Sequence, residues 1–257
     1  YCLGTIHYKD ENLTEAVKCF DFAGIINEKY VPAHLNLGNI YYVQEEYEKA
    51  IDCFKKILEI SSDDIFALCY IANCYKCMGN TKKAREFYKK ALKVDSNFSD
   101  AWHGLGTAYQ QDENFTVALE YFKKAIDLDK DDHSFWISLA DCYHELDQFT
   151  EAHAAYQKAL DLDSLNPDYV KAFCLFLGDY DFESEAVDIL NDALDIHTED
   201  PDLQLVMAGL LIKLDLAHEA VFYLAEAKDV ENNSYKIFCE LFPELGDHYL
   251  VQEVFNP

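Results

Sequence analysis

Three cysteines lie close together in the sequence and could bind a metal or carry redox chemistry. Cys74 and Cys77 have the C-x-x-C spacing of zinc ribbons and thiol–disulfide enzymes, and Cys69 precedes them. However, the surrounding segment has the apolar pattern of a helix interior, and no second pair follows at zinc-ribbon distance. We therefore interpret these thiols as packing residues and expect neither a metal nor a cofactor, with a redox or metal role for Cys74 and Cys77 as the alternative.

Alternating aspartates resemble the start of a calcium-binding loop. Asp127, Asp129 and Asp131 have the required spacing, but the sixth place of such a loop is Asp132 instead of glycine. The twelfth place is Ser138, where the loop needs glutamate. These residues fit better to a turn that caps the following helix.

No group of residues has the spacing of a catalytic site. His144 and Glu145 are adjacent, but no second histidine follows at the spacing of a metalloprotease helix. The chain also lacks a glycine-rich phosphate loop and a nucleophile elbow. We predict no catalytic residues, and we do not expect this protein to be an enzyme.

The elements that position these residues are predicted to be helices. The 257 residues are 50% apolar and 14% aromatic, which is ample for a continuous core. The chain has only 9 glycines and 5 prolines. It therefore lacks the frequent turns of a β-sandwich or β-barrel and has no flexible linker. The composition favours an all-α protein.

The charge of the chain is strongly negative and unevenly distributed. Its 21 basic and 48 acidic residues give a net charge of −27, which disfavours nucleic acid and anionic membranes as partners. Residues 1–98 carry a net charge of −1 and residues 99–257 one of −26. The acidic part could attract a basic partner, and the alternative is a solvated outer face that keeps the protein soluble.

Other features of the sequence concern location. The apolar run Leu205 to Ile212 is too short to span a bilayer, and the residues that follow Tyr1 do not resemble a signal peptide. The nine cysteines are an odd number without scaffold-like spacing, which favours reduced thiols and a cytoplasmic location. Because the chain opens without methionine, we expect it to be a piece of a longer protein.

A period of 34 residues runs through the sequence without an insertion. An alanine recurs at this period, at Ala16, Ala50, Ala84, Ala118, Ala152, Ala186 and Ala220. A large apolar residue follows each alanine by four positions, on the same helical face: Phe20, Phe54, Tyr88, Phe122, Tyr156, Leu190 and Leu224. The pattern predicts that both series are buried.

A second set of positions repeats upstream of the alanines. Large residues recur at Leu3, Leu37, Ile71, Leu105, Leu139, Phe173 and Met207, each followed by a small residue that lets helices approach closely. Four residues later the stripe continues at His7, Tyr41, Tyr75, Tyr109, Tyr143, Leu177 and Leu211. Each period therefore predicts two amphipathic helices of about 14 residues.

The best copy of this pattern is Trp102, Leu105, Gly106 and Tyr109, spaced as Trp-x-x-Leu-Gly-x-x-Tyr. It resembles the tetratricopeptide repeat family, and in particular multi-repeat scaffold proteins of the bacterial cytoplasm. The resemblance implies an all-α fold, a right-handed α-α superhelix (solenoid) of about seven helical hairpins with a C-terminal capping helix. One departure is that the usual inter-repeat proline is replaced, at Glu28, Ser62, Ser96, Lys130, Ser164, Thr198 and Asn232.

The predicted domain organisation follows from the period. We expect an array over residues 1–234 and a cap over 235–257. The repeats are predicted at 1–30, which is partial, and at 31–64, 65–98, 99–132, 133–166, 167–200 and 201–234.

The resemblance also implies where a ligand would bind, because in this family the first helix of each hairpin lines a concave groove. The candidate groove residues are Asn39, Tyr42, Asn73, Lys76, His103, Gln110, Asp141, His144 and Glu145. We favour Asn39 and Asn73, since a carboxamide can both donate to and accept from a peptide main chain, although asparagines at such places are often only solvated. The basic residues of the family's carboxylate clamp are missing.

Three hypotheses for function follow. The first is a scaffold or adaptor that binds a protein or peptide in the groove. The second is a non-catalytic targeting arm of a larger enzyme. The third is a self-assembling structural array that associates through the partial N-terminal repeat, whose apolar surface would otherwise be bare.

Overall fold

The computed structural model describes residues 1–10, 12–164, 166–230 and 233–255, and these consist of helices joined by short turns. The described residues contain no strand, so the prediction of an all-α solenoid is confirmed. They form two compact units, Tyr1–Leu146 and Asp147–Pro257. No helix in the described ranges is long and apolar enough to cross a membrane.

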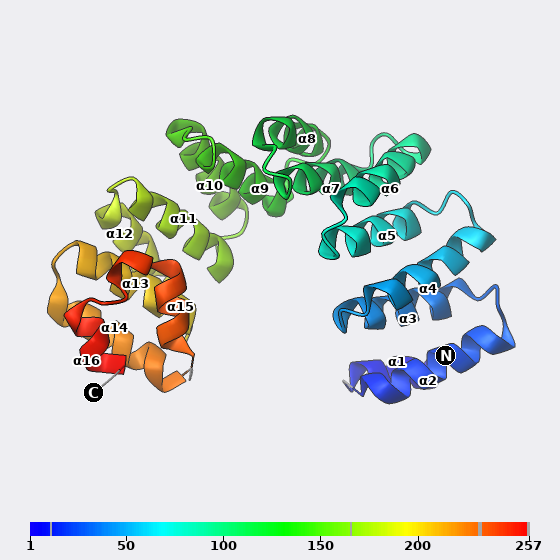
Figure 1. The fold of residues 1–257 in the computed structure, drawn as a ribbon, viewed down its shortest axis with the longest axis horizontal. Coiled ribbons are helices and arrows are strands. Elements are labelled where there is room, and N and C mark those ends of the chain that lie inside the picture. Colours follow the sequence, from blue (N-terminus) through cyan, green and yellow to red (C-terminus); the bar gives the residue numbers. More distant parts are fainter. Residues whose placement is uncertain (11, 165, 231–232, 256–257) are drawn as a thin grey trace. The chain divides into compact units, whose positions relative to one another are not determined.

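The first unit contains nine helices that pack in chain order. They are α1 (Cys2–Lys9), α2 (Leu13–Ile26), α3 (Val31–Val43), α4 (Tyr47–Ile60), α5 (Ile65–Cys77), α6 (Thr81–Val94), α7 (Ser99–Gln110), α8 (Phe115–Leu128) and α9 (His133–His144). Each helix contacts the next one, and α7 also contacts α5 and α9 (Figure 1). Stacking of neighbours supplies the burial that helices of this length cannot obtain alone.

The second unit continues with the same kind of packing. It contains α10 (Phe149–Leu162), α11 (Pro167–Asp179), α12 (Glu183–Leu194), α13 (Pro201–Lys213), α14 (Ala217–Val230), α15 (Ser234–Leu241), η1 (Pro243–Leu245) and α16 (Tyr249–Phe255). The C-terminal cap is therefore two short helices and a 3-10 turn, with α15 packed on α13 and α16 on α14. The proposed bounds of the repeats remain a prediction.

The core follows the 34-residue register. All seven recurring alanines are fully buried, and the large residues four positions later are at most 2% exposed. The upstream series is buried from Leu37 onward, whereas Leu3 in the partial first repeat is 57% exposed. The main packing partner of α1 is α2, so α1 is covered less than the helices farther along the stack.

Close contact between the two helices of a hairpin depends on the small residues. A Cβ atom on Gly106 would lie 2.4 Å from Cε1 of Phe122, a distance at which real atoms clash. Glycine at this place lets α7 and α8 approach until the Phe122 ring lies against the α7 backbone. The sequence pattern predicted this approach correctly.

The turn inside each hairpin has one recurring conformation. Glu45, Gly79, Glu113, Asp147, Asp181 and Asp215, spaced by 34 residues, have positive φ angles between 55° and 71°. Where both ends lie in one unit, the next residue donates its N–H to a carbonyl five residues before it, as Glu46 does to Tyr41 at 2.8 Å. This is the Schellman arrangement, which satisfies carbonyls at the end of the first helix.

The turn between hairpins is held by a side chain of the following helix. Trp102 Nε1 donates to the carbonyl of Ser96 at 2.8 Å, and Trp136 Nε1 to that of Lys130 at 3.0 Å. Gln204 does the same to Thr198, and His34 Nε2 lies 2.8 Å from the carbonyl of Glu28. These four carbonyls belong to places where the family usually has proline. A side-chain hydrogen bond therefore holds the turn at these four places, where this chain lacks that proline.

Candidate functional site

A pocket of the first unit brings three of the predicted groove residues together. It has a volume of about 400 Å³ and includes Asn73 and Lys76 from α5 and His103 from α7. The other residues that line it are Phe66, Cys69, Tyr70, Tyr88, Phe98, Asp100, Gly104, Asp132, Ser134 and Phe135. The first helices of neighbouring hairpins therefore create a cavity with amide, ammonium, imidazole and carboxylate groups.

Asn73 is oriented by a tyrosine from the second helix of its hairpin. The hydroxyl of Tyr88 donates a hydrogen bond to Oδ1 of Asn73. Burial raises the pKa of Tyr88 above its usual value, so the hydroxyl keeps its proton and remains a donor. Because this bond fixes Oδ1 as the acceptor, the Nδ2 amide of Asn73 is left to donate to a ligand.

Tyr88 can reach Asn73 because Gly104 makes room for its ring. A Cβ atom on Gly104 would lie 2.3 Å from Cε1 of Tyr88. Three of the other six residues in this series are phenylalanines, and only a tyrosine adds a hydroxyl at the end of the ring. The pair Tyr88 and Gly104 thus links the packing of α6 and α7 to the orientation of a groove amide.

Lys76 is the one lysine that lines the pocket, and it is half-buried. Burial lowers the pKa of its ammonium group, because removing water disfavours the charged form. Within the described ranges no carboxylate forms an ion pair with it. A charge held in this way is stabilised by any ligand that brings an anionic or carbonyl oxygen.

His103 is held between aromatic rings. Its ring centroid lies 4.7 Å from that of Phe135 and 5.3 Å from that of Phe122, and its Nε2 lies 2.8 Å from Oγ of Ser138. Burial, assisted by the charge of Lys76, lowers its pKa to about 4. The imidazole is therefore neutral at pH 7 and offers one donor and one acceptor.

Carboxylates also line the pocket. Burial and the charges of Asp132 and Asp129 raise the pKa of Asp100. Asp132 caps α9, since its Oδ1 accepts from the backbone N–H of Ser134 at 2.9 Å. Asp129 likewise accepts from the N–H of Asp131 at 3.1 Å, so the interpretation of this segment as a capping turn is confirmed.

The C-x-x-C pair lies within α5, as predicted, and its thiols face different surroundings. Cys74 is buried and Cys77 is exposed. Burial raises the pKa of Cys74 to about 12, and that of Cys69 to about 12, so both thiols are protonated at neutral pH. In the described part of the chain no three His, Cys, Asp or Glu side chains are grouped to hold a metal ion.

Tyr42 connects the first helix of one hairpin to that of the next. Its hydroxyl lies 3.3 Å from Sγ of Cys77, and burial raises its pKa. Asn39, one turn earlier on α3, is half-buried and has no hydrogen-bond partner for its side chain within the described residues. Its carboxamide therefore remains available.

The remaining candidates do not line the pocket. Gln110 is half-buried at the end of α7. Asp141 and His144 are half-buried on α9 and interact with other residues, and Glu145 is exposed just after this helix. The structure thus brings Asn73, Lys76 and His103 together and leaves the other six candidates elsewhere along the first helices.

The prediction missed other residues of the pocket, among them Tyr88, Phe98, Asp132 and Phe135. Tyr88 lies on a second helix, and Phe98 and Asp132 lie in turns, whereas the resemblance implies a groove lined by first helices. The exchange of phenylalanine for tyrosine at Tyr88 was a usable signal. Phe98, Asp132 and Phe135 had no such signal in the sequence.

Comparisons with known proteins identify the family. Residues 30–97 match one tetratricopeptide repeat profile, and residues 78–133 and 103–167 match a second. Together these matches cover more than half of the chain. The chain belongs to the tetratricopeptide repeat family, whose members generally mediate protein–protein contacts and are generally not catalysts.

Solved structures share the fold at low sequence identity. A tetratricopeptide repeat protein of Parabacteroides merdae is 16% identical, with a TM-score of 0.69 over 97% of this chain and 96% of that one. PilF of Pseudomonas aeruginosa is 19% identical, with a TM-score of 0.66 over 83% and 97%. YrrB, described as having an unusual peptide-binding site, is 22% identical, with a TM-score of 0.51 over 73% and 97%. A search of the curated proteins gives no significant match.

Proposed function

We propose that this protein is a scaffold or adaptor that binds an extended segment of another protein along α3, α5 and α7. The observation that carries the proposal is the pocket in which Asn73, Lys76 and His103 meet. A peptide-binding site in YrrB, which has the same fold, agrees with it. The nine cysteines are all unpaired, which favours a reducing compartment such as the cytoplasm.

The chemistry of the groove suits a peptide main chain. The Nδ2 amide of Asn73 can donate to a peptide carbonyl, and the unpaired carboxamide of Asn39 can both donate and accept. Lys76 would gain an ion pair from an acidic side chain of the ligand. Asp100 can accept from a peptide N–H or pair with a basic side chain, and the acidic residues of 99–257 add long-range attraction for a basic partner.

Exchanging both asparagines for alanine should weaken partner binding. With Asn39→Ala and Asn73→Ala together, we expect at least about tenfold lower affinity for the segment that the wild type binds, because two main-chain contacts are lost. Partners crosslinked to the wild type in the source cell would supply the segment, and its dissociation constant would be measured by calorimetry.

The matched control is Asn191→Ala, an exposed asparagine of α12. It should leave the affinity within about twofold. Equal affinity of the wild type and the double variant would contradict binding in this groove.

Self-association is a second candidate function, favoured by one observation. Phe22, Ile25 and Ile26 form an apolar face of α2, with exposed fractions of 64%, 68% and 70%. Neighbouring Leu3 and Ile6 on α1 are also more than half exposed. An apolar patch of this kind is typical of an interaction surface.

Light scattering would test this second candidate. We expect the wild type to gain mass as its concentration rises, and Ile25→Ser with Ile26→Ser to remain a monomer, because the apolar face is removed. Ile196→Ser, at a 59% exposed position in the second unit, is the control and should behave like the wild type. A monomer mass for the wild type at all concentrations would exclude self-association.

A further inference from the structure

A second pocket of the first unit lies away from the predicted groove residues. It has a volume of about 450 Å³ and lies among α6, α7 and α8. Its apolar residues are Leu92, Trp102, Leu105 and Tyr121, and its basic residues are Lys89, Lys93 and Lys124, with Ser96 beside them. None of the nine predicted groove residues lines it.

The aromatic rings of this pocket are held by contacts with each other and with the backbone. The rings of Trp102 and Tyr121 stack with centroids 5.9 Å apart and planes 21° apart. The indole N–H of Trp102 is fixed by its bond to the carbonyl of Ser96. Lys124 Nζ lies 4.8 Å from the centroid of the Trp102 ring, which holds its charge at the edge of the apolar surface.

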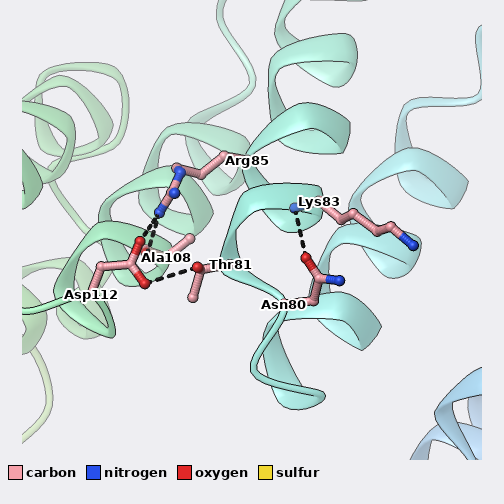
Figure 2. Close-up of polar contacts among 6 residues, drawn as sticks. All are labelled: Asn80, Thr81, Lys83, Arg85, Ala108 and Asp112. Atoms are coloured by element: carbon pink, nitrogen blue, oxygen red, sulfur yellow. Dashed lines mark hydrogen bonds and ion pairs between the residues drawn. The ribbon is translucent and has the colours of Figure 1, made fainter.

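Several basic residues of α6 already have partners within the fold. Arg85 pairs with Asp112 and donates to the carbonyl of Ala108 at 3.1 Å, while Thr81 donates to Asp112 at 2.8 Å (Figure 2). These bonds fasten α6 to the end of α7. Lys83 lies over the ring of Tyr75 and Lys90 over that of its α6 neighbour Phe87.

The three lysines of the pocket differ from Arg85, because none of them has a carboxylate partner in the described ranges. Lys89, Lys93 and Lys124 are exposed, and within the described ranges no carboxylate forms an ion pair with any of them. Lys89 and Lys93 are also four residues apart on α6, an arrangement in which like charges repel. Three lysines without an ion pair thus line an apolar pocket in a protein whose net charge is −27.

We infer that this pocket binds an acidic segment of a partner protein that places one bulky apolar side chain against Trp102 and Tyr121. Its carboxylates would pair with Lys89, Lys93 and Lys124, which is the charge complementarity that the pocket offers. The apolar side chain distinguishes this ligand from a simple polyanion, because Leu92 and Leu105 give no advantage to a charged group. The surface is independent of the groove, so the protein would hold two segments at once.

Fluorescence of Trp102 provides a direct test. The chain has two tryptophans, so Trp136→Phe leaves Trp102 alone to report. A tryptophan-free peptide with one leucine flanked by aspartates and glutamates should shift the Trp102 emission on titration. In anisotropy measurements, Lys89→Glu with Lys93→Glu should lower the affinity for the peptide at least about tenfold.

Matched controls separate local contacts from overall charge. Lys55→Glu with Lys82→Glu changes the net charge by the same amount, at exposed lysines that do not line the pocket. The affinity of this control for the acidic peptide should stay within about twofold of the wild-type affinity. The peptide with alanine instead of leucine should bind at least about tenfold more weakly. The variant Asn39→Ala with Asn73→Ala should bind the acidic peptide normally, which keeps this test separate from that of the groove.

Four results would overturn the inference. The first is an equal loss of peptide affinity in the Lys89/Lys93 variant and in the Lys55/Lys82 control. The second is peptide binding without a change in Trp102 emission, and the third is loss of peptide binding in the Asn39/Asn73 variant. The fourth is binding of a poly-uridine oligonucleotide or of a second copy of the chain at these lysines while the acidic peptide fails to bind.

Discussion

Replacing Phe122 with alanine is expected to lower the free energy of unfolding by about 3–5 kcal/mol. The ring is fully buried, lies against the backbone of α7 at Gly106, and packs beside the imidazole of His103. Its removal leaves a cavity between α7 and α8 that neighbouring rings cannot fill without moving. In a stack of hairpins, the damage weakens the contacts with both neighbours. Urea denaturation followed by circular dichroism would measure the change.

Phe22→Ala is the matched control for this prediction. Phe22 is a phenylalanine of the same unit but is 64% exposed, so its loss should cost less than about 1 kcal/mol. If Phe122→Ala were no more destabilising than Phe22→Ala, the register that places Phe122 in the core would be wrong.

The stability of the protein should fall between pH 7 and pH 5, with His103 contributing about 2 kcal/mol of the loss. The pKa of His103 is lowered to about 4 in the folded protein, against about 6.5 for an unfolded histidine. Between these values the unfolded chain binds the additional proton, so acidification favours unfolding. The contribution is fully present above about pH 6.5 and lost below about pH 4.

His103→Gln would isolate this effect, because glutamine cannot titrate but can still bond to Ser138. We expect its unfolding free energy to depend less on pH than that of the wild type by about 2 kcal/mol between pH 7 and 5. His218→Gln, at an exposed histidine of α14, should retain the wild-type dependence. An unchanged pH dependence in His103→Gln would contradict the neutral, buried imidazole.

Part of the candidate site could be found from sequence. Asn73, Lys76 and His103 follow from the resemblance to the tetratricopeptide repeat family, which implies that these places of each repeat face the groove. The sequence could not predict that these three residues line one pocket, since this depends on how closely α5 and α7 pack. Gly104 and Tyr88, which bring α7 close to α6 and let the Tyr88 hydroxyl reach Asn73, do not belong to the predicted groove residues. The lysine pocket was missed for the same reason, as its residues come from three helices.

The turns show a different limit. Left-handed backbone recurs every 34 residues from Glu45 to Asp215, yet only Gly79 has the residue type that signals it. At the other five places the conformation is imposed by the hydrogen bonds and packing of the hairpin, which outweigh a local cost of about 1 kcal/mol. Leu3 is the reverse case, because leucine is a residue type that is usually buried, yet here it is 57% exposed on α1.

The sequence by itself therefore determined the helical hairpins, their register and the residues of the core. These depend on the spacing of small and large residues along a helix, which is local and repeats at each period. Only the tertiary structure decided which amide is oriented by Tyr88, which histidine is neutral, and which lysines remain unpaired beside Trp102. Those properties depend on distances between side chains of different helices, and such distances are fixed when the hairpins stack.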